Sequence, residues 1–175
     1  MKIFNILVAI IILSSCNSCK ENKTEQLCSN RTPFVGNELR LDGYYYKQYD
    51  ESPARREIIF LYRNGVLLHG GMVYLVDLVE MEESYASGGY YNLARNDQNV
   101  WGNFRLSNVI FSYEKWYPST NNQLAFMNVG EIVNDTTFQI LSSFRCDGSQ
   151  KITVNDLFLF KHFPSKPDST NQFVN

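Results

Sequence analysis

Short stretches of alternating apolar and polar residues run through most of the chain from Leu39 onward. An alternation with a period of two is typical of half-buried β-strands. Aromatic and β-branched residues, which favour pleated sheets, are frequent in these stretches. The pattern predicts seven to nine strands, over residues 39–49, 58–62, 66–69, 100–106, 109–116, 124–133, 136–144, 152–154 and 157–163.

Turn-forming residues separate these stretches and make most of the predicted connections tight. Asn64-Gly65 lies between two apolar stretches, and both residues tolerate the positive φ of a two-residue hairpin. Two further turns are expected between neighbouring predicted strands, at Ser107-Asn108 and at Asn134-Asp135. Further breaks are expected over residues 51–56 with Pro53, at Gly70-Gly71, over 118–122, at Asp147-Gly148 and at Asn155-Asp156.

One segment in the middle of the chain has a different period. Apolar residues recur at spacings of three and four between Met72 and Val79, and polar residues follow them. This spacing predicts a helix over Leu75–Tyr85, with a strand as the alternative. The glycines at 88 and 89 are expected to end it, and residues 90–98 to form a loop.

Many short strands with tight connections predict a β-sandwich or a closed barrel. A meander of about eight strands leaves two exposed edges unless its first strand pairs with its last, and closure removes both edges. The predicted fold class is therefore mainly β, an antiparallel meander of about eight strands closing into a barrel, with one short helix in mid-chain.

Gly43-Tyr44-Tyr45 opens the first predicted strand, where lipocalin-like (calycin) barrels often carry Gly-x-Trp. With its meander over residues 39–163, the chain resembles that superfamily, although it has Tyr in place of Trp and its helix lies in mid-chain. The resemblance implies a barrel that holds a small apolar ligand. The chain also resembles small lipoproteins of Gram-negative bacteria, through residues 101–104, 130–138 and 166–171, and that group implies no activity.

The N-terminus has the layout of a secretory signal. Lys2 precedes an apolar run from Ile6 to Leu13, which is shorter than the roughly 20 residues that a membrane-spanning helix needs. Leu13-Ser14-Ser15-Cys16 resembles the lipobox of bacterial lipoproteins. The resemblance implies cleavage before Cys16 and attachment of several lipid chains, palmitate among them, to that cysteine. A buried apolar helix and an uncleaved anchor are the alternatives.

The expected domain organisation follows from these patterns. Residues 1–15 are the predicted signal peptide, and residues 16–38 the lipidated cysteine with a polar tether. Residues 39–163 form the predicted barrel, and residues 164–175 a polar tail that Pro167 keeps out of a strand. The predicted location is the cell envelope, lipid-anchored at the outer membrane and facing the periplasm or the cell surface.

Three cysteines remain if Cys16 is lipidated, and a compartment outside the inner membrane permits disulfides. Cys28–Cys146 is the favoured pair because both lie in or beside the predicted barrel, and Cys19 is left over; free thiols are the alternative. The formal net charge is −2, and it becomes −3 without Lys2. This balance predicts no nucleic-acid partner.

The sequence lacks several common catalytic and metal-binding motifs. It has neither Gly-x-Ser-x-Gly nor His-Glu-x-x-His, and no glycine-rich phosphate loop. Its two histidines, His69 and His162, fall on predicted strands, which favours a structural role. The acidic residues at 77, 80, 82 and 83 lack the spacing of a calcium loop and are expected on a solvated helix face. We expect no catalytic residues, metal or cofactor.

Four aromatic residues are candidates for a ligand-lining surface, with ordinary core packing as the alternative: Tyr44, Tyr46, Trp101 and Trp116. The expected function is that of a membrane-anchored envelope lipoprotein acting as a structural or protein-interaction module. The alternative is a lipocalin-like carrier of a small apolar ligand. The expected partners are the membrane, through the N-terminal lipid, and either an envelope protein or a small apolar ligand.

Overall fold

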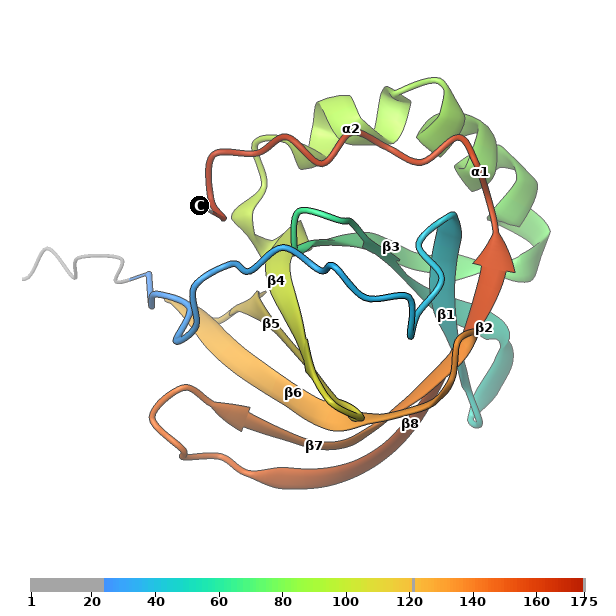
Figure 1. Ribbon diagram of the computed structural model, residues 1–175. Coiled ribbons are helices and arrows are strands. Elements are labelled where there is room, and N and C mark those ends of the chain that lie inside the picture. Colours follow the sequence, from blue (N-terminus) through green and yellow to red (C-terminus); the bar gives the residue numbers. More distant parts are fainter. Residues whose placement is uncertain (1–23, 121, 175) are drawn as a thin grey trace, which may run out of the picture.

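A computed structural model describes residues 24–120 and 122–174. Within them, eight antiparallel strands follow one another around a closed barrel, each paired with the next and β1 with β8 (Figure 1). The predicted meander closing into a barrel is confirmed. The strands are β1 (Gly43–Tyr49), β2 (Ser52–Leu61), β3 (Val66–Tyr74), β4 (Trp101–Ser107), β5 (Ile110–Pro118), β6 (Gln123–Asn134), β7 (Thr137–Arg145) and β8 (Ile152–His162).

The connection between β3 and β4 is helical. It contains the 3₁₀ turns η2 (Leu75–Asp77) and η3 (Gln98–Val100) and the helices α1 (Leu78–Ala86) and α2 (Gly89–Ala94). Because η2 runs directly into α1, the helix predicted over Leu75–Tyr85 is confirmed. Both helices lie on one side of the barrel, beside the C-terminal segment (Figure 1).

The loop predicted over residues 90–98 is wrong, because α2 occupies its first half. The reason is tertiary packing. The Tyr90 hydroxyl donates to the carbonyl of His69, and the Trp101 indole nitrogen donates to the carbonyl of Ala94 at 2.9 Å. These contacts tie both ends of a six-residue helix to the barrel wall, and local sequence spacing does not encode them.

Part of the barrel wall buries side chains on both of its faces. Successive residues of a strand point to opposite sides, so Tyr45 enters the barrel interior while Tyr44 enters a second apolar layer outside it. The helices and the C-terminal segment cover this outer layer. The interior includes Phe34, Leu39, Ile59, Leu61, Leu67, Phe104, Phe111, Phe138 and Phe158, and the outer layer Ile58, Phe60, Val66, Leu68, Tyr85, Trp101 and Val174.

Several predicted strand limits are corrected by the structure. Pro53, placed in a connection, lies in β2 at the tight turn from β1. Gly70-Gly71 was expected to end a strand, but β3 continues through it to Tyr74. The ladder shifts register there and Gly71 has a φ of 95°, so the glycines form a β-bulge. The turn predicted at Asn155-Asp156 is absent because β8 is continuous there.

The segment from Thr24 to Glu38 packs against the barrel, so the predicted tether does not extend over these residues. Phe34 is 8% exposed and Leu39 is 1% exposed, and both close one end of the barrel interior. A disulfide joins Cys28 to Cys146 after β7, which confirms the favoured pairing. In Figure 1 this segment, in blue, runs across the barrel from β6 towards β1.

The C-terminal tail lies outside the strands, as predicted, and it too packs on the barrel. The Lys166 ammonium donates to the carbonyls of Leu41 and Leu61, at 2.7 and 2.6 Å. Pro167 is buried, and Val174 is 4% exposed within the outer apolar layer. The tail therefore helps to hold the outer layer in place.

Among the described residues, no helix has the length and apolar character needed to cross a membrane. The predicted signal peptide, the predicted lipid site Cys16 and the predicted unpaired Cys19 lie outside the described residues.

Candidate functional site

Charged side chains occupy inward-facing positions at the end of the barrel opposite Phe34. Lys47 follows Tyr45 on β1 and faces Phe158 of β8, while Glu57 of β2 is the register partner of Lys47. Lys115 of β5 lies two residues beyond Tyr113, whose side chain is in the interior. The interior therefore has an aromatic half and a charged half.

Glu57 is the centre of the charged half. Its carboxylate is 3.1 Å from the Lys47 ammonium and 3.3 Å from the His69 Nε2, and it accepts a hydrogen bond from the Tyr49 hydroxyl at 2.8 Å. Lys47 also contacts the Asp156 carboxylate at 3.0 Å. Lys47 thus bridges two carboxylates, and Glu57 is surrounded by groups that stabilise its charged form.

The surroundings shift the pKa of each group in a consistent direction. Burial opposes the charge of Glu57, but His69 and the nearby lysines outweigh it and hold the pKa of Glu57 well below its usual range. Burial, followed by the charge of Lys115, lowers the pKa of His69. Burial also lowers the pKa of Lys115, to about 8.

The outer apolar layer leaves a second feature, a pocket of about 210 Å³ beneath η2 and α1. The Tyr44 hydroxyl and the Lys161 ammonium both donate to Glu82 of α1, each at 2.6 Å, at its edge. These bonds fix α1 over the outer faces of β1 and β8. The pocket is lined by Tyr44, Tyr46, Arg56, Ile58, Leu75, Leu78, Phe160 and Lys161.

An exposed apolar run, which we call the α1 rim, borders this pocket. It comprises Met72, Tyr74, Leu75, Val76 and Val79, whose exposed fractions range from 44% for Leu75 to 87% for Val76. Exposed apolar residues that lie close together in a chain mark interaction sites more often than scattered ones do. The apolar residues whose spacing predicted the helix therefore do not all pack against the barrel, and several of them form an exposed surface.

The four predicted ligand-lining aromatics lie outside the barrel interior, all in or against the outer layer. Tyr44 and Tyr46 line the pocket beneath α1. Trp116 lines a second cavity beside the N-terminal segment, where its indole nitrogen donates to the carbonyl of Glu25 at 2.6 Å. Trp101 is fully buried and holds α2 in place.

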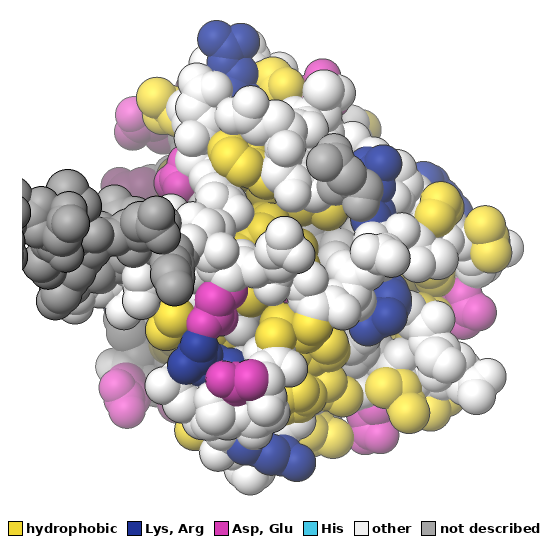
Figure 2. All heavy atoms as spheres, turned by 90° about the vertical axis from the view of Figure 1, so that its left-hand side faces the viewer, with side chains coloured by type: hydrophobic (Ala, Val, Ile, Leu, Met, Phe, Trp, Pro, Cys, Tyr) yellow, Lys and Arg dark blue, Asp and Glu magenta, His cyan; other side chains and the backbone are white. Residues whose placement is uncertain are grey.

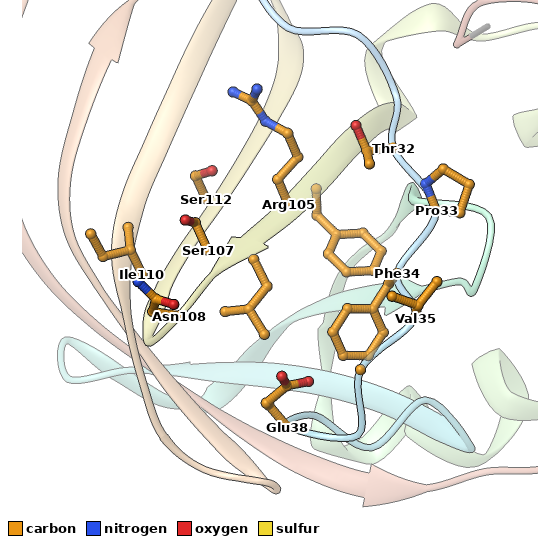
Figure 3. A pocket seen from close by; sticks show the side chains of 13 residues that line it. Thr32, Pro33, Phe34, Val35, Glu38, Arg105, Ser107, Asn108, Ile110 and Ser112 are labelled. Carbon is orange, nitrogen blue, oxygen red and sulfur yellow. The ribbon is translucent and has the colours of Figure 1, made fainter.

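A larger groove of about 590 Å³ lies at the end of the barrel that Phe34 closes. Figure 3 shows it between the N-terminal segment and the β4–β5 hairpin, with Phe34 and Val35 on one side and Ser107 and Asn108 on the other. The face in Figure 2 shows hydrophobic side chains between charged ones of both signs. That face presents no large region of one sign.

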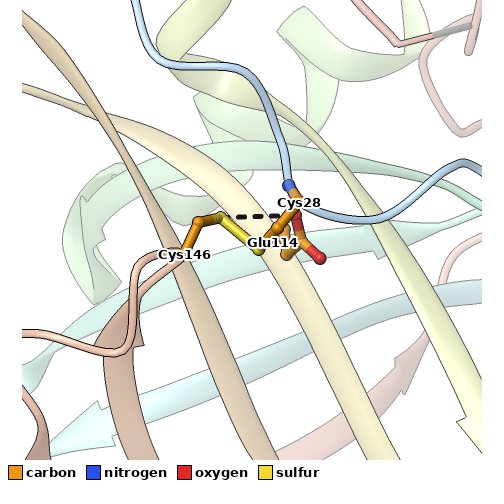
Figure 4. Close-up of side chains that lie close together, drawn as sticks. All are labelled: Cys28, Glu114 and Cys146. Atoms are coloured by element: carbon orange, nitrogen blue, oxygen red, sulfur yellow. Dashed lines mark hydrogen bonds between the residues drawn. A yellow bond between two sulfur atoms is a disulfide. The ribbon is translucent and has the colours of Figure 1, made fainter.

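Cys28, Cys146 and Glu114 lie close together beside the N-terminal segment (Figure 4). Both sulfurs are in the disulfide, so they are not available as metal ligands in this form. The carboxylate of Glu114 is 1% exposed and accepts from the backbone nitrogens of Cys28 and Ser29, at 2.7 and 3.2 Å. Among the described residues, this cluster therefore attaches the N-terminal segment to β5.

Sequence reasoning missed the charged half of the interior. The available signal was a lysine two residues after an aromatic residue on a predicted strand, and therefore on the same face, as Lys47 is after Tyr45 and Lys115 is after Tyr113. Both histidines lie on strands, as predicted. His162 is exposed beside Asp42, whereas His69 lies in the charged half of the interior beside Glu57. The acidic residues Asp77, Glu80 and Glu83 are exposed.

Comparison with protein-family models, with curated proteins and with solved structures found no match for this chain. The features that bear on function are therefore the charged half of the interior and the α1 rim with its pocket.

Proposed function

We propose that this chain is a lipid-anchored protein of the cell envelope that binds a partner protein through the α1 rim. The observation that carries the proposal is the exposed apolar run beside a pocket on a rigid barrel wall. Protein interfaces concentrate affinity where an apolar side chain of one partner fills a pocket of the other. The N-terminal pattern around Cys16 supplies the anchor.

Packing of the interior supports an outer binding surface over the carrier alternative. Phe138 stacks on Phe158 with ring centroids 4.8 Å apart, and it also lies 4.3 Å from the Phe111 ring and 5.0 Å from the Tyr45 ring. These rings occupy the space that a lipocalin-like carrier gives to its ligand. The carrier alternative, with a small apolar ligand in the aromatic half of the interior, rests on the barrel architecture and the resemblance alone.

Charge at the pocket indicates the chemistry of the partner. Arg56 lines the pocket, and the hydrogen bonds of its guanidinium within the described residues go to the backbone carbonyls of Pro53 and Arg55. A guanidinium is well suited to bind a carboxylate. The second cation, Lys161, is already paired with Glu82. We therefore expect the partner to present an apolar side chain next to an acidic residue.

The anchor would keep this surface close to the membrane. Thr24 bridges to Gln123, at the barrel end where β3 gives way to η2, so the chain enters the domain at the same end as the α1 rim. The eight residue steps from Cys16 to Thr24 span at most about 29 Å. A partner bound there would itself be at or near the membrane.

Replacing Leu75 and Val76 by Glu in the full-length protein is expected to reduce partner capture by about tenfold or more, because the charges cannot be buried in an apolar interface. The measurement is crosslinking in intact membranes followed by quantitative mass spectrometry of the captured protein. The matched control is Val133→Glu on β6, where the valine is 55% exposed. Equal capture by the double variant and the control would contradict the proposal.

A further inference from the structure

Three potential hydrogen-bond donors lie on inward-facing positions in the charged half of the barrel. Lys115 of β5 faces Gly102 of β4, which contributes no side chain to the interior. A Cβ atom at Gly102 would come within 3.0 Å of the Lys115 Cβ. Asn128 of β6 is the register partner of Tyr113, so it is the diagonal neighbour of Lys115 across the ladder. His69 is the third donor, on β3.

Each of these donors lacks a well-formed partner within the described residues. Lys115 is 5% exposed, and no carboxylate of those residues lies within 4.0 Å of its ammonium, which instead lies 4.3 Å from the Tyr117 ring centroid. The Asn128 amide nitrogen is buried without a hydrogen bond. The His69 Nε2 approaches Glu57 to 3.3 Å, but its direction is outside hydrogen-bond geometry.

Leaving several donors unpaired in one enclosed region is costly, and a buried cation is the most costly of them. The charge of Glu57 compensates Lys115 only in part, because burial still lowers the pKa of Lys115. Lys47 also shares the carboxylates of Glu57 and Asp156, at 3.1 and 3.0 Å. An acceptor from outside the chain would supply the negative charge that Lys115 lacks within the described residues. The side chain of Asp156 is 36% exposed, so this region reaches solvent beside Asp156.

We propose that the charged half of the barrel binds a small carboxylate, with Lys115 as its counter-ion and Asn128 and His69 as hydrogen-bond donors. A singly charged group fits better than a phosphate, because Glu57 and Asp156 repel additional negative charge. The site is enclosed by the barrel and is separate from the α1 rim. It would recognise the acid group of a small metabolite, independently of any protein partner.

The test is thermal unfolding of the full-length protein in detergent at pH 7, with sodium acetate compared against sodium chloride at equal ionic strength. Acetate is expected to raise the melting temperature by about 2–4 °C, because a ligand that binds the folded state stabilises it. Lys115→Met and Asn128→Asp should each abolish this shift. His162→Gln, a change at an exposed histidine, should retain it.

The acetate effect should also fade as the pH rises through about 8, because the Lys115 amine then loses its charge. The charged and titratable groups that act on this amine or its neighbours are Lys47, Tyr49, Glu57, His69, Asp97, Tyr113, Tyr117 and Asp156. An equal shift with phosphate, no shift beyond that of chloride, or a shift retained by Lys115→Met would each overturn the proposal.

Discussion

Removing the disulfide by the double substitution Cys28→Ala and Cys146→Ala is expected to lower the free energy of unfolding by about 4–5 kcal/mol. The two cysteines are 118 residues apart, so the bridge closes most of the domain into one loop. An open chain gains the conformational entropy that this closure removes from the unfolded state. Urea unfolding of the two proteins measures the difference.

The same substitution should release the N-terminal segment locally. Without the bridge this segment is held by non-covalent contacts alone, among them the hydrogen bonds of Glu114 to the backbone nitrogens of Cys28 and Ser29 and that of Trp116 to the carbonyl of Glu25. Hydrogen exchange is expected to rise over residues 24–38 before it rises in the strands. Cys19→Ala, which leaves the bridge intact, is the control. A loss of stability below about 1 kcal/mol would contradict the expectation.

Replacing Lys115 by Met is expected to raise the free energy of unfolding by about 3 kcal/mol at pH 7. Burial lowers the pKa of Lys115 from 10.5 to about 8, and each unit corresponds to about 1.4 kcal/mol. The folded state binds the proton of the Lys115 ammonium less tightly than the unfolded state does. The charge therefore lowers the free energy of unfolding by its full amount below about pH 8, and this loss of stability disappears as the pH rises from about 8 to 10.5. Met removes the charge and fills a similar volume.

Whether Lys115→Met raises or lowers the free energy of unfolding shows whether Lys115 is a binding residue or a structural one. Urea unfolding should give a higher free energy of unfolding for the variant than for the natural protein at both pH 7 and pH 9.5. The difference between the two proteins should be smaller at pH 9.5. Lys161→Met removes an ammonium whose side chain is 42% exposed and is the matched control. A destabilised Lys115→Met variant would show that the ammonium has a stabilising partner in the folded protein. A gain in stability would mean that this lysine is kept at a cost, as functional residues often are.

The alternation of apolar and polar residues was sufficient to predict the barrel, because each strand has at least one buried face. It was less informative about β2, where Ile58, Ile59, Phe60 and Leu61 are all buried. Residues on one face enter the interior and those on the other enter the outer layer. Periodicity cannot distinguish these two layers, so the outer layer and the helices that cover it were only partly foreseen.

Long-range contacts account for most of the differences between the predicted and observed structures. The residues around Phe34 are polar and contain Pro33 and Gly36, which is typical of a linker, yet Phe34 and Leu39 seal the barrel. The charged half of the interior also depends on long-range contacts. Lys47 and Lys115 stand at inward positions, and only the register of the ladder shows that their side chains share one region with Glu57.

The lipid anchor is tested most directly by growing cells that express the full-length chain with an alkyne analogue of palmitate and measuring label on the purified protein. The proposal predicts label that partitions with the membrane fraction and is lost, together with membrane association, in Cys16→Ser. The conservative change keeps the size of the side chain but removes the thiol that carries lipid. An unlabelled protein in the soluble fraction, or label that persists in Cys16→Ser, would contradict a lipid-anchored module.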